Sequence, residues 1–189
     1  MARTIMPSFE KHPQEGVIIG RLLAGYADLE IALLNCVQVV REDFDAVLKT
    51  MFRIRGETNR INIADALGRE HYAVHNLETD FAEAIKATRF CLKIRNQYSH
   101  CVWWSDNSGK LAFANLEEVA KGDELVGSLK DLTAYHVDEP LLRAQEAYYL
   151  YTNDLIGWIN YEGRLKAGKL SANLLSRPVV LKPPLLHVQ

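Results

Sequence analysis

Apolar residues recur every three or four positions along most of this chain, the spacing that places them on one face of an α-helix. The first such run covers residues 14–40, and its apolar positions are Ile18, Leu22, Leu29, Leu33, Cys36 and Val40. The same spacing predicts further helices, which cover residues 43–55, 59–75, 80–101 and 138–168. The hydrophobic pattern therefore predicts about five helices.

Local signals mark where these helices begin and end. Asp43 is a suitable N-cap for the second helix, and Gly56 breaks the chain before the third. Thr79 or Asp80 can cap the fourth helix. The last helix has a strong start, because Asp138 can cap it and Pro140 suits its first turn.

Between the fourth and last helices the pattern changes. Residues 102–104 and 111–113 are apolar, and they flank a turn-rich link over residues 105–110, which is typical of a short β-hairpin. One more short strand is expected within residues 129–137. Prolines make the apolar segment 171–189 extended, and we expect it to lie along a groove of its own domain or of a partner subunit.

The predicted fold class is all-α: a bundle of about five helices with a small β-hairpin insertion after the fourth helix. We divide the chain into an irregular N-terminal leader (1–13), one helical domain (14–170) and an extended, proline-rich C-terminal tail (171–189).

Composition narrows the classes of function. Apolar residues make up 48% of the chain and charged residues 24%, as in ordinary globular proteins. A formal net charge of -2 argues against binding of nucleic acid through the overall charge of the protein. A local basic patch remains compatible with this charge. Neither a signal peptide nor a membrane-spanning stretch is evident, so we expect a soluble cytoplasmic protein with no membrane contact.

The cysteines also favour a cytoplasmic protein. Cys36, Cys91 and Cys101 lack zinc-ligand spacing and lie in apolar surroundings. Buried free thiols in a reducing cytoplasm are the expected state.

The helix predicted over residues 80–101 carries a polar stripe opposite its apolar one. Its members are Glu83, Lys86, Arg89, Lys93, Asn96 and His100. Steps of three or four keep them on one face, which becomes basic toward its C-terminal end. Lys86, Arg89 and Lys93 are candidate contacts for an RNA backbone. An ordinary solvated helix face has the same appearance.

The candidate catalytic residues are Arg95, Asn96 and His100, near the end of this helix. Asn96 and His100 are about 40° apart around the helix, and the long side chain of Arg95 can bend toward them. A place in the last helical turn favours protonated histidine, whereas the neighbouring cations disfavour it. His100 can therefore act as an acid or a base near neutral pH.

RNA is the substrate that suits this chemistry, because its 2′-hydroxyl is an internal nucleophile beside the scissile phosphate. His100 would take the 2′-proton or protonate the leaving oxygen. Arg95 would stabilise the phosphoryl oxygens, and Asn96 would orient the phosphate or the imidazole. Neither a metal nor a cofactor is required. One histidine cannot easily perform both proton transfers, so a dimer of two such helices is expected.

The segment Arg95–His100 resembles the arginine-to-histidine motif of HEPN domains, a compact all-α group that includes many RNases. In that family four to six residues separate the arginine from the histidine, and a polar residue usually follows the arginine, as Asn96 does here. The apolar approach over residues 90–94 is also similar, and the resemblance covers roughly residues 14–169. The tryptophan-rich hairpin and the tail depart from the family pattern.

The resemblance implies a homodimer with a shared cleft and metal-independent RNA cleavage. Many HEPN members act in toxin–antitoxin, phage-defence or RNA-processing systems, so an antitoxin or a regulatory protein is a further expected partner. Other members are binding or regulatory modules, including relatives that resemble a mannitol operon repressor. A non-catalytic interaction module is therefore the alternative function.

Each candidate also has a purely structural interpretation. His100 would then cap helix carbonyls or pack against Trp103 or Trp104. Arg95 and Asn96 would instead pair with an acid of the first helix, such as Asp28 or Glu30. Trp103 and Trp104 would cover the core rather than stack on bases. His71 and His75 are four residues apart on the third predicted helix, a spacing that suits two ligands of one metal ion. A third ligand is not evident in the sequence, so we expect no metal site.

Overall fold

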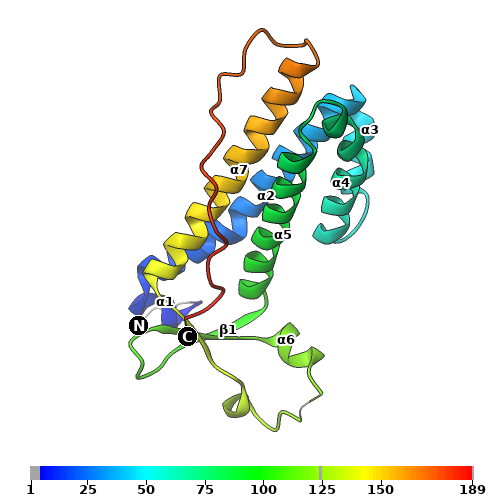
Figure 1. Ribbon diagram of the computed structural model, residues 1–189. Helices are drawn as coiled ribbons and strands as arrows, with labels where there is room; N and C mark the ends of the chain where they lie inside the picture. The colour runs from blue at the N-terminus through cyan, green and yellow to red at the C-terminus, as the bar shows by residue number, and fades with distance from the viewer. Residues whose placement is uncertain (1–4, 124, 189) are drawn as a thin grey trace. The chain divides into compact units, whose positions relative to one another are not determined.

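The structure, a computed structural model, describes residues 5–123 and 125–188. These residues form seven α-helices, one short 3-10 helix and three strands. The helices are α1 (Pro7–Lys11), α2 (Pro13–Arg41), α3 (Phe44–Phe52), α4 (Glu57–Val74), α5 (Glu78–Tyr98), α6 (Leu116–Lys121) and α7 (Glu139–Lys166). The strands are β1 (Cys101–Ser105), β2 (Leu111–Asn115) and β3 (Tyr135–Val137), and the 3-10 helix η1 is Leu129–Asp131 (Figure 1).

The mainly helical fold with a β insertion is confirmed, but the number of elements differs from the prediction. Five of the helices correspond to the five periodic runs. The other two, α1 and α6, have five and six residues, too short for a periodic signal. Pro7 occupies the first turn of α1, where its missing N–H costs nothing, so the predicted leader is not wholly irregular.

Several predicted boundaries are confirmed by local contacts. The Asp43 carboxylate accepts a hydrogen bond from the Ala46 amide at 3.0 Å, and Asp138 accepts one from Leu141 at 3.1 Å. Gly56 has φ 91°, a left-handed conformation that glycine adopts without strain. The fourth predicted helix is wrong at both ends: α5 begins at Glu78, so Thr79 and Asp80 lie inside it rather than cap it, and it ends at Tyr98, because Cys101 begins a strand.

The β insertion is a three-stranded antiparallel sheet of order β1-β2-β3, larger than the expected hairpin. Trp103 pairs with Phe113 between β1 and β2, and Phe113 pairs with Tyr135 of β3. The extra strand expected within residues 129–137 is therefore confirmed as its last three residues. Every residue of the central strand β2 is buried, which makes it the core of the sheet.

The chain divides into two compact units. The sheet unit contains residues 5–24, 93–123, 125–147 and 184–188, and the helical unit contains residues 25–92 and 148–183. Helices α2, α5 and α7 each contribute residues to both units.

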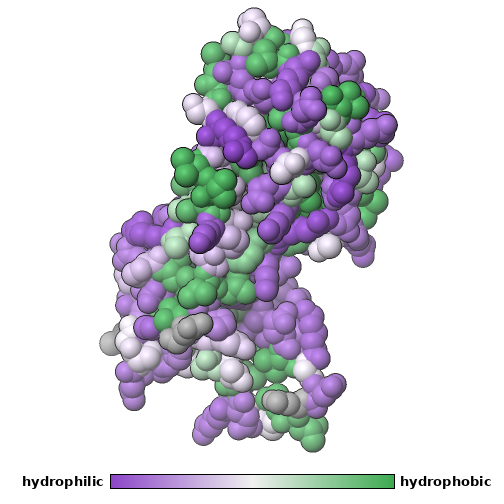
Figure 2. All heavy atoms as spheres, viewed as in Figure 1, coloured by the Kyte–Doolittle hydropathy of each residue, from purple (hydrophilic) through white to green (hydrophobic). Residues whose placement is uncertain are grey.

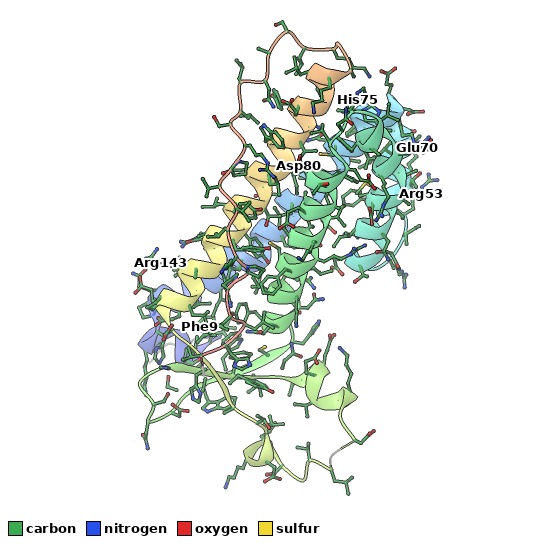
Figure 3. All side chains as sticks on the ribbon, in the orientation of Figure 1. Phe9, Arg53, Glu70, His75, Asp80 and Arg143 are labelled. Atoms are coloured by element: carbon green, nitrogen blue, oxygen red, sulfur yellow. The ribbon has the colours of Figure 1, made fainter. Side chains whose placement is uncertain are left out.

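An aromatic cluster stabilises the sheet unit. The ring of Trp103 lies 5.6 Å from Phe9, 5.8 Å from Tyr98 and 5.2 Å from Phe113, measured between ring centroids. Phe9 comes from α1, and Figure 3 shows it at the start of the chain beside the sheet. Trp103 is therefore a packing residue, in agreement with its structural interpretation.

The helical unit is held by side chains that bond to the backbone of neighbouring helices. The Tyr72 hydroxyl of α4 donates to the carbonyl of Cys36 in α2, and the Cys36 thiol donates to the carbonyl of Ile156 in α7. The Tyr149 hydroxyl of α7 donates to the carbonyl of Cys91 in α5. Burial of these groups without partners would be costly, so each bond fixes one helix against another.

Tyr72 also sits at the tightest point of this unit. Its ring stacks on Phe81 with centroids 4.6 Å apart. A Cβ atom at Gly163 would lie 2.8 Å from the Tyr72 ring, and one at Gly68 would lie 2.6 Å from the Phe81 ring. Two glycines therefore make room for the aromatic stack.

The C-terminal tail is extended, as expected, and it contacts its own chain in each unit. In the helical unit Arg177 donates to Asp80, which Figure 3 labels on α5. In the sheet unit the Leu186 carbonyl accepts from Gln97 and from the buried Gln145, and Val188 bridges to His136. The tail therefore contacts its own chain through these residues, as one of the two expected alternatives has it.

Many apolar tail side chains nevertheless face solvent. They are Leu174, Leu175, Val179, Val180, Leu181 and Leu185, with Val179 89% exposed. Figure 2 shows apolar side chains on the surface where the tail runs along α7. Separately, none of the helices within the described residues is long and apolar enough to cross a membrane.

Candidate functional site

The site begins where α5 ends. His100 lies two residues beyond the helix and has φ 60°, a left-handed conformation that few residues other than glycine adopt. The expectation that His100 occupies the final helical turn is therefore wrong. The Leu116 amide donates to the His100 carbonyl at 3.1 Å, so the start of α6 fixes the turn that carries the imidazole.

Asn115 determines this geometry. Its Nδ2 group donates to the carbonyls of Asn96, Gln97 and Ser99 at 2.8–3.2 Å. These carbonyls lie at and just beyond the C-terminal end of α5, where the helix itself provides no amide donors for them. Its Oδ1 atom accepts from the amides of Glu117 and Glu118, which caps the start of α6. Asn115 is only 6% exposed, so one buried amide joins the two helix ends.

This junction presents Glu117 to His100. Nε2 of His100 and Oε1 of Glu117 are 3.4 Å apart, an ion-pair distance rather than a short hydrogen bond. The two side chains are 63% and 54% exposed, respectively. His100 is therefore open to solvent. Its charged neighbour is a carboxylate from a helix that the hydrophobic pattern did not predict.

Arg95 and Asn96 form a pair of their own. Nη1 of Arg95 donates to Oδ1 of Asn96 at 3.0 Å, with Arg95 half-buried and Asn96 exposed. The amide thus orients the guanidinium, whereas its predicted target was the phosphate or the imidazole. Arg95, Asn96 and His100 all belong to the sheet unit, so the motif lies within one compact body.

The three basic residues of the polar stripe have different environments. Lys93, in the sheet unit, is exposed, and so is Lys86 in the helical unit. Arg89 instead donates to Asn62 of α4 at 3.0 Å and lies 3.5 Å from the Asp65 carboxylate. The Asp65 carboxylate offsets its charge within the helical unit. Its role as an RNA contact stays a prediction, and the alternative is that Arg89 joins α5 to α4.

Glu30, one of the two acids expected to pair with Arg95, has a different partner in the helical unit. Both carboxylate oxygens of Glu30 accept from Arg60 at 2.9 Å. Glu30 is almost fully buried, so this pair supplies the compensation that its charge requires.

The thiols do not provide a nucleophile. Burial raises the pKa of Cys36 to about 11 and that of Cys91 to about 12. Burial likewise raises the pKa of Cys101 to about 12. All three are free thiols that stay protonated at neutral pH. Cys36 and Cys91 are buried, as expected, whereas Cys101 is only half-buried.

The rings of His71 and His75 lie 4.7 Å apart at the end of α4. Within residues 5–123 and 125–188, however, His, Cys, Asp and Glu side chains form no cluster of three or more that could hold a metal ion. Desolvation lowers the pKa of His71, with His75 adding to the effect, so this histidine is mainly neutral at pH 7.

Sequence reasoning missed two residues of the site, Asn115 and Glu117. The sequence Asn115-Leu116-Glu117-Glu118 does contain a helix-start signal, namely an N-cap asparagine followed by acids in the first turn. The short length of α6 concealed it.

Comparisons with models of known protein families, with curated proteins and with solved structures found no match to this chain. The chemistry of the site is accordingly judged from its own residues. An exposed imidazole beside a carboxylate can exchange protons, and an arginine held by an amide can bind an oxyanion.

Proposed function

We propose that this protein is a metal-independent endoribonuclease of the HEPN type, with His100, Arg95 and Asn96 as its catalytic residues. The observation that carries the proposal is the position of His100. It is exposed, faces the Glu117 carboxylate and sits in a left-handed backbone conformation. Such strain in a non-glycine residue persists only where surrounding bonds enforce it, and it is concentrated at functional sites.

Glu117 gives the histidine a defined role. A carboxylate near Nε2 favours the tautomer whose proton is on Nε2, which leaves the lone pair of Nδ1 available as a base. Nδ1 would accept the proton of the RNA 2′-hydroxyl. Glu117 would act as a positioning residue, because its negative charge also stabilises the imidazolium that results.

The reaction is an internal transesterification. The 2′-oxygen forms a bond to phosphorus while the bond from phosphorus to the 5′-oxygen breaks, and Arg95 stabilises the charge on the phosphoryl oxygens. The 5′-oxygen leaves with a proton from a second acid. In a homodimer the imidazolium of a second copy supplies it. The products are a 2′,3′-cyclic phosphate and a 5′-hydroxyl.

The test is an RNA cleavage assay with purified protein in the presence of a chelator. We expect cleavage that leaves cyclic phosphate ends. Asparagine tolerates left-handed backbone but carries no titratable group, so His100→Asn should reduce the cleavage rate by at least about 100-fold, the usual contribution of an acid–base group. The matched control is His75→Asn, at the end of α4, which should cleave like the parent. Failure to cut any RNA, or undiminished cleavage by His100→Asn, would refute the proposal.

A non-catalytic interaction module is the second candidate function, and the exposed apolar tail favours it. A row of solvent-facing aliphatic side chains suits an apolar surface of an antitoxin or a regulatory protein. The test is binding to candidate partners by a variant with serine at Leu174, Val179 and Val180. This function is supported over the nuclease if the serine variant loses partner binding and neither the parent nor the variant cleaves RNA.

A further inference from the structure

The helical unit contains a pocket between α2 and α7, separate from the residues assigned to RNA cleavage. Its volume is about 290 Å³. Ala32 of α2 and Gly157 of α7 contribute little side-chain bulk to its wall, and the Leu175 side chain lies next to Gly157. The rest of the lining is polar: Asn35, Asn153, Asn160, Tyr161 and Arg164.

Two hydrogen-bond donors of this lining are buried without a partner. Asn160 is only 5% exposed, and among the described residues its Nδ2 atom makes no hydrogen bond. The Nε atom of Arg164 is likewise buried and without a bond inside the described part of the chain. Asn160 lies close enough to the Cys36 thiol to oppose part of the pKa rise that burial causes there, but the geometry falls short of a hydrogen bond.

Buried donors without acceptors are unusual, because each gives up hydration and receives nothing in return. A structural role would explain them if they bonded to a neighbouring carbonyl, as Tyr72 and Tyr149 do in the same unit. Asn160 and Arg164 instead line an open space. An acceptor that enters this space would satisfy both.

The charge of the pocket identifies the kind of acceptor. Arg164 contributes a permanent cation, and the lining includes no carboxylate. The amides of Asn35 and Asn153 and the Tyr161 hydroxyl add further donors around it. An oxyanion group with several acceptor oxygens suits one guanidinium surrounded by neutral donors.

We propose that this pocket binds the oxyanion group, a phosphate or a carboxylate, of a small ligand. Arg164 pairs with its charge, and Asn160 donates to it from the buried side. Asn153, which is exposed, forms the rim where the ligand enters. The proposal is independent of RNA cleavage, since none of these residues belongs to the Arg95–His100 motif.

The experiment titrates the full-length protein with inorganic phosphate and, separately, with acetate, at constant ionic strength maintained with chloride. Side-chain amide signals of Asn35, Asn153 and Asn160 are followed by NMR. We expect saturable shifts of these signals with at least one of the two anions. A response to phosphate alone identifies a phosphate ligand, and a response to acetate alone identifies a carboxylate.

Two variants test the site. Arg164→Gln removes the cation, and Asn153→Asp places a negative charge at the rim without altering the buried wall. Each should weaken anion binding at least tenfold. The matched controls are Lys166→Gln, at an exposed position of α7 two residues beyond Arg164, and Asn107→Asp in the hairpin turn. Both should bind like the parent.

Asn153→Asp keeps the experiment decisive if Arg164→Gln does not fold, because residue 153 is on the surface. Absence of saturable shifts with both anions would overturn the proposal. So would equal binding by the parent and Asn153→Asp. Unchanged RNA cleavage by Asn153→Asp is expected in any case, so the two proposals fail or succeed separately.

Discussion

At the scale of single residues, the sequence motif and the structure agree on some properties of the site and differ on others. The neighbours Arg95 and Asn96 are hydrogen-bonded, and His100 is exposed. The exposure of His100 follows from its place on the polar stripe, so it was predictable. The hydrogen bond from Arg95 differs from the prediction, in which Asn96 orients the phosphate or the imidazole. The pairing of His100 with Glu117 was not predictable, because 16 further residues of chain and two strands separate them.

The left-handed conformation of His100 leads to a stability prediction. A Cβ atom in this conformation costs about 1 kcal/mol, whereas glycine adopts it freely. His100→Gly should therefore be about 1 kcal/mol more stable than His100→Ala, measured as the free energy of unfolding in urea. Both variants should lack RNA cleavage. Equal stabilities, or a more stable alanine variant, would show that the turn relaxes when the histidine is replaced.

At the scale of elements, boundaries set by neighbouring residues could be read from the sequence, and boundaries set by distant ones could not. Asp43, Gly56 and Asp138 act on residues within one turn of themselves. The end of α5 depends on Asn115, which arrives from the far end of β2. No local pattern near residue 98 contains that information, so the helix was predicted three residues too long.

Asn115 should accordingly be one of the most sensitive positions of the sheet unit. Asn115→Ala removes the donor for the carbonyls of Asn96, Gln97 and Ser99 and the cap of α6, so we expect a loss of about 2–3 kcal/mol in the free energy of unfolding. Chemical denaturation measures it. The control is Asn107→Ala, at an exposed turn position, which should change stability by less than about 0.5 kcal/mol.

The hairpin turn provides a pH-dependent contact in the same sheet. Nε2 of His136, in β3, lies 2.7 Å from the Asp106 carboxylate. The hydrogen bond from His136, and then those from Ser108, hold the pKa of Asp106 well below its ordinary value of 3.8. A depressed folded pKa means that this contact stabilises the fold above pH 3.8 and is progressively lost as pH falls below it.

Asp106→Asn should therefore reduce stability near neutral pH and flatten its decline in acid. Thermal unfolding of both proteins between pH 2 and pH 7 measures the difference. Parallel curves for parent and variant would mean that Asp106 does not contribute this pH dependence. The size of the effect should fall with added salt, because both side chains are partly exposed.

At the scale of the whole molecule, the general character of the fold was predictable and the role of the tail was left open. Helical periodicity identified the long helices, because each buries a continuous stripe. The tail has no periodicity, so only the structure reveals that it contacts its own chain through backbone carbonyls. Gln145 is fully buried, and its amide donates to the carbonyls of Leu185 and Leu186.

Removal of residues 184–189 should consequently destabilise the protein. It leaves the Gln145 amide and the Gln97 side chain without their acceptors, at a cost of about 1–3 kcal/mol for the buried group. The control, Leu185→Ser, keeps the backbone and should unfold like the parent. Thermal unfolding measures the stability of these proteins, and an unchanged melting temperature after the truncation would contradict the proposed anchoring role. Sedimentation of the same proteins shows whether the truncation also alters self-association.

The aromatic stack in the helical unit constrains how this protein can change over evolution. Tyr72 and Phe81 occupy volume that Gly163 and Gly68 leave free. A bulkier residue at either glycine position is tolerable only if the opposing ring shrinks at the same time. Diverged relatives should hence display compensating exchanges, ring for side chain, at 72 with 163 and at 81 with 68.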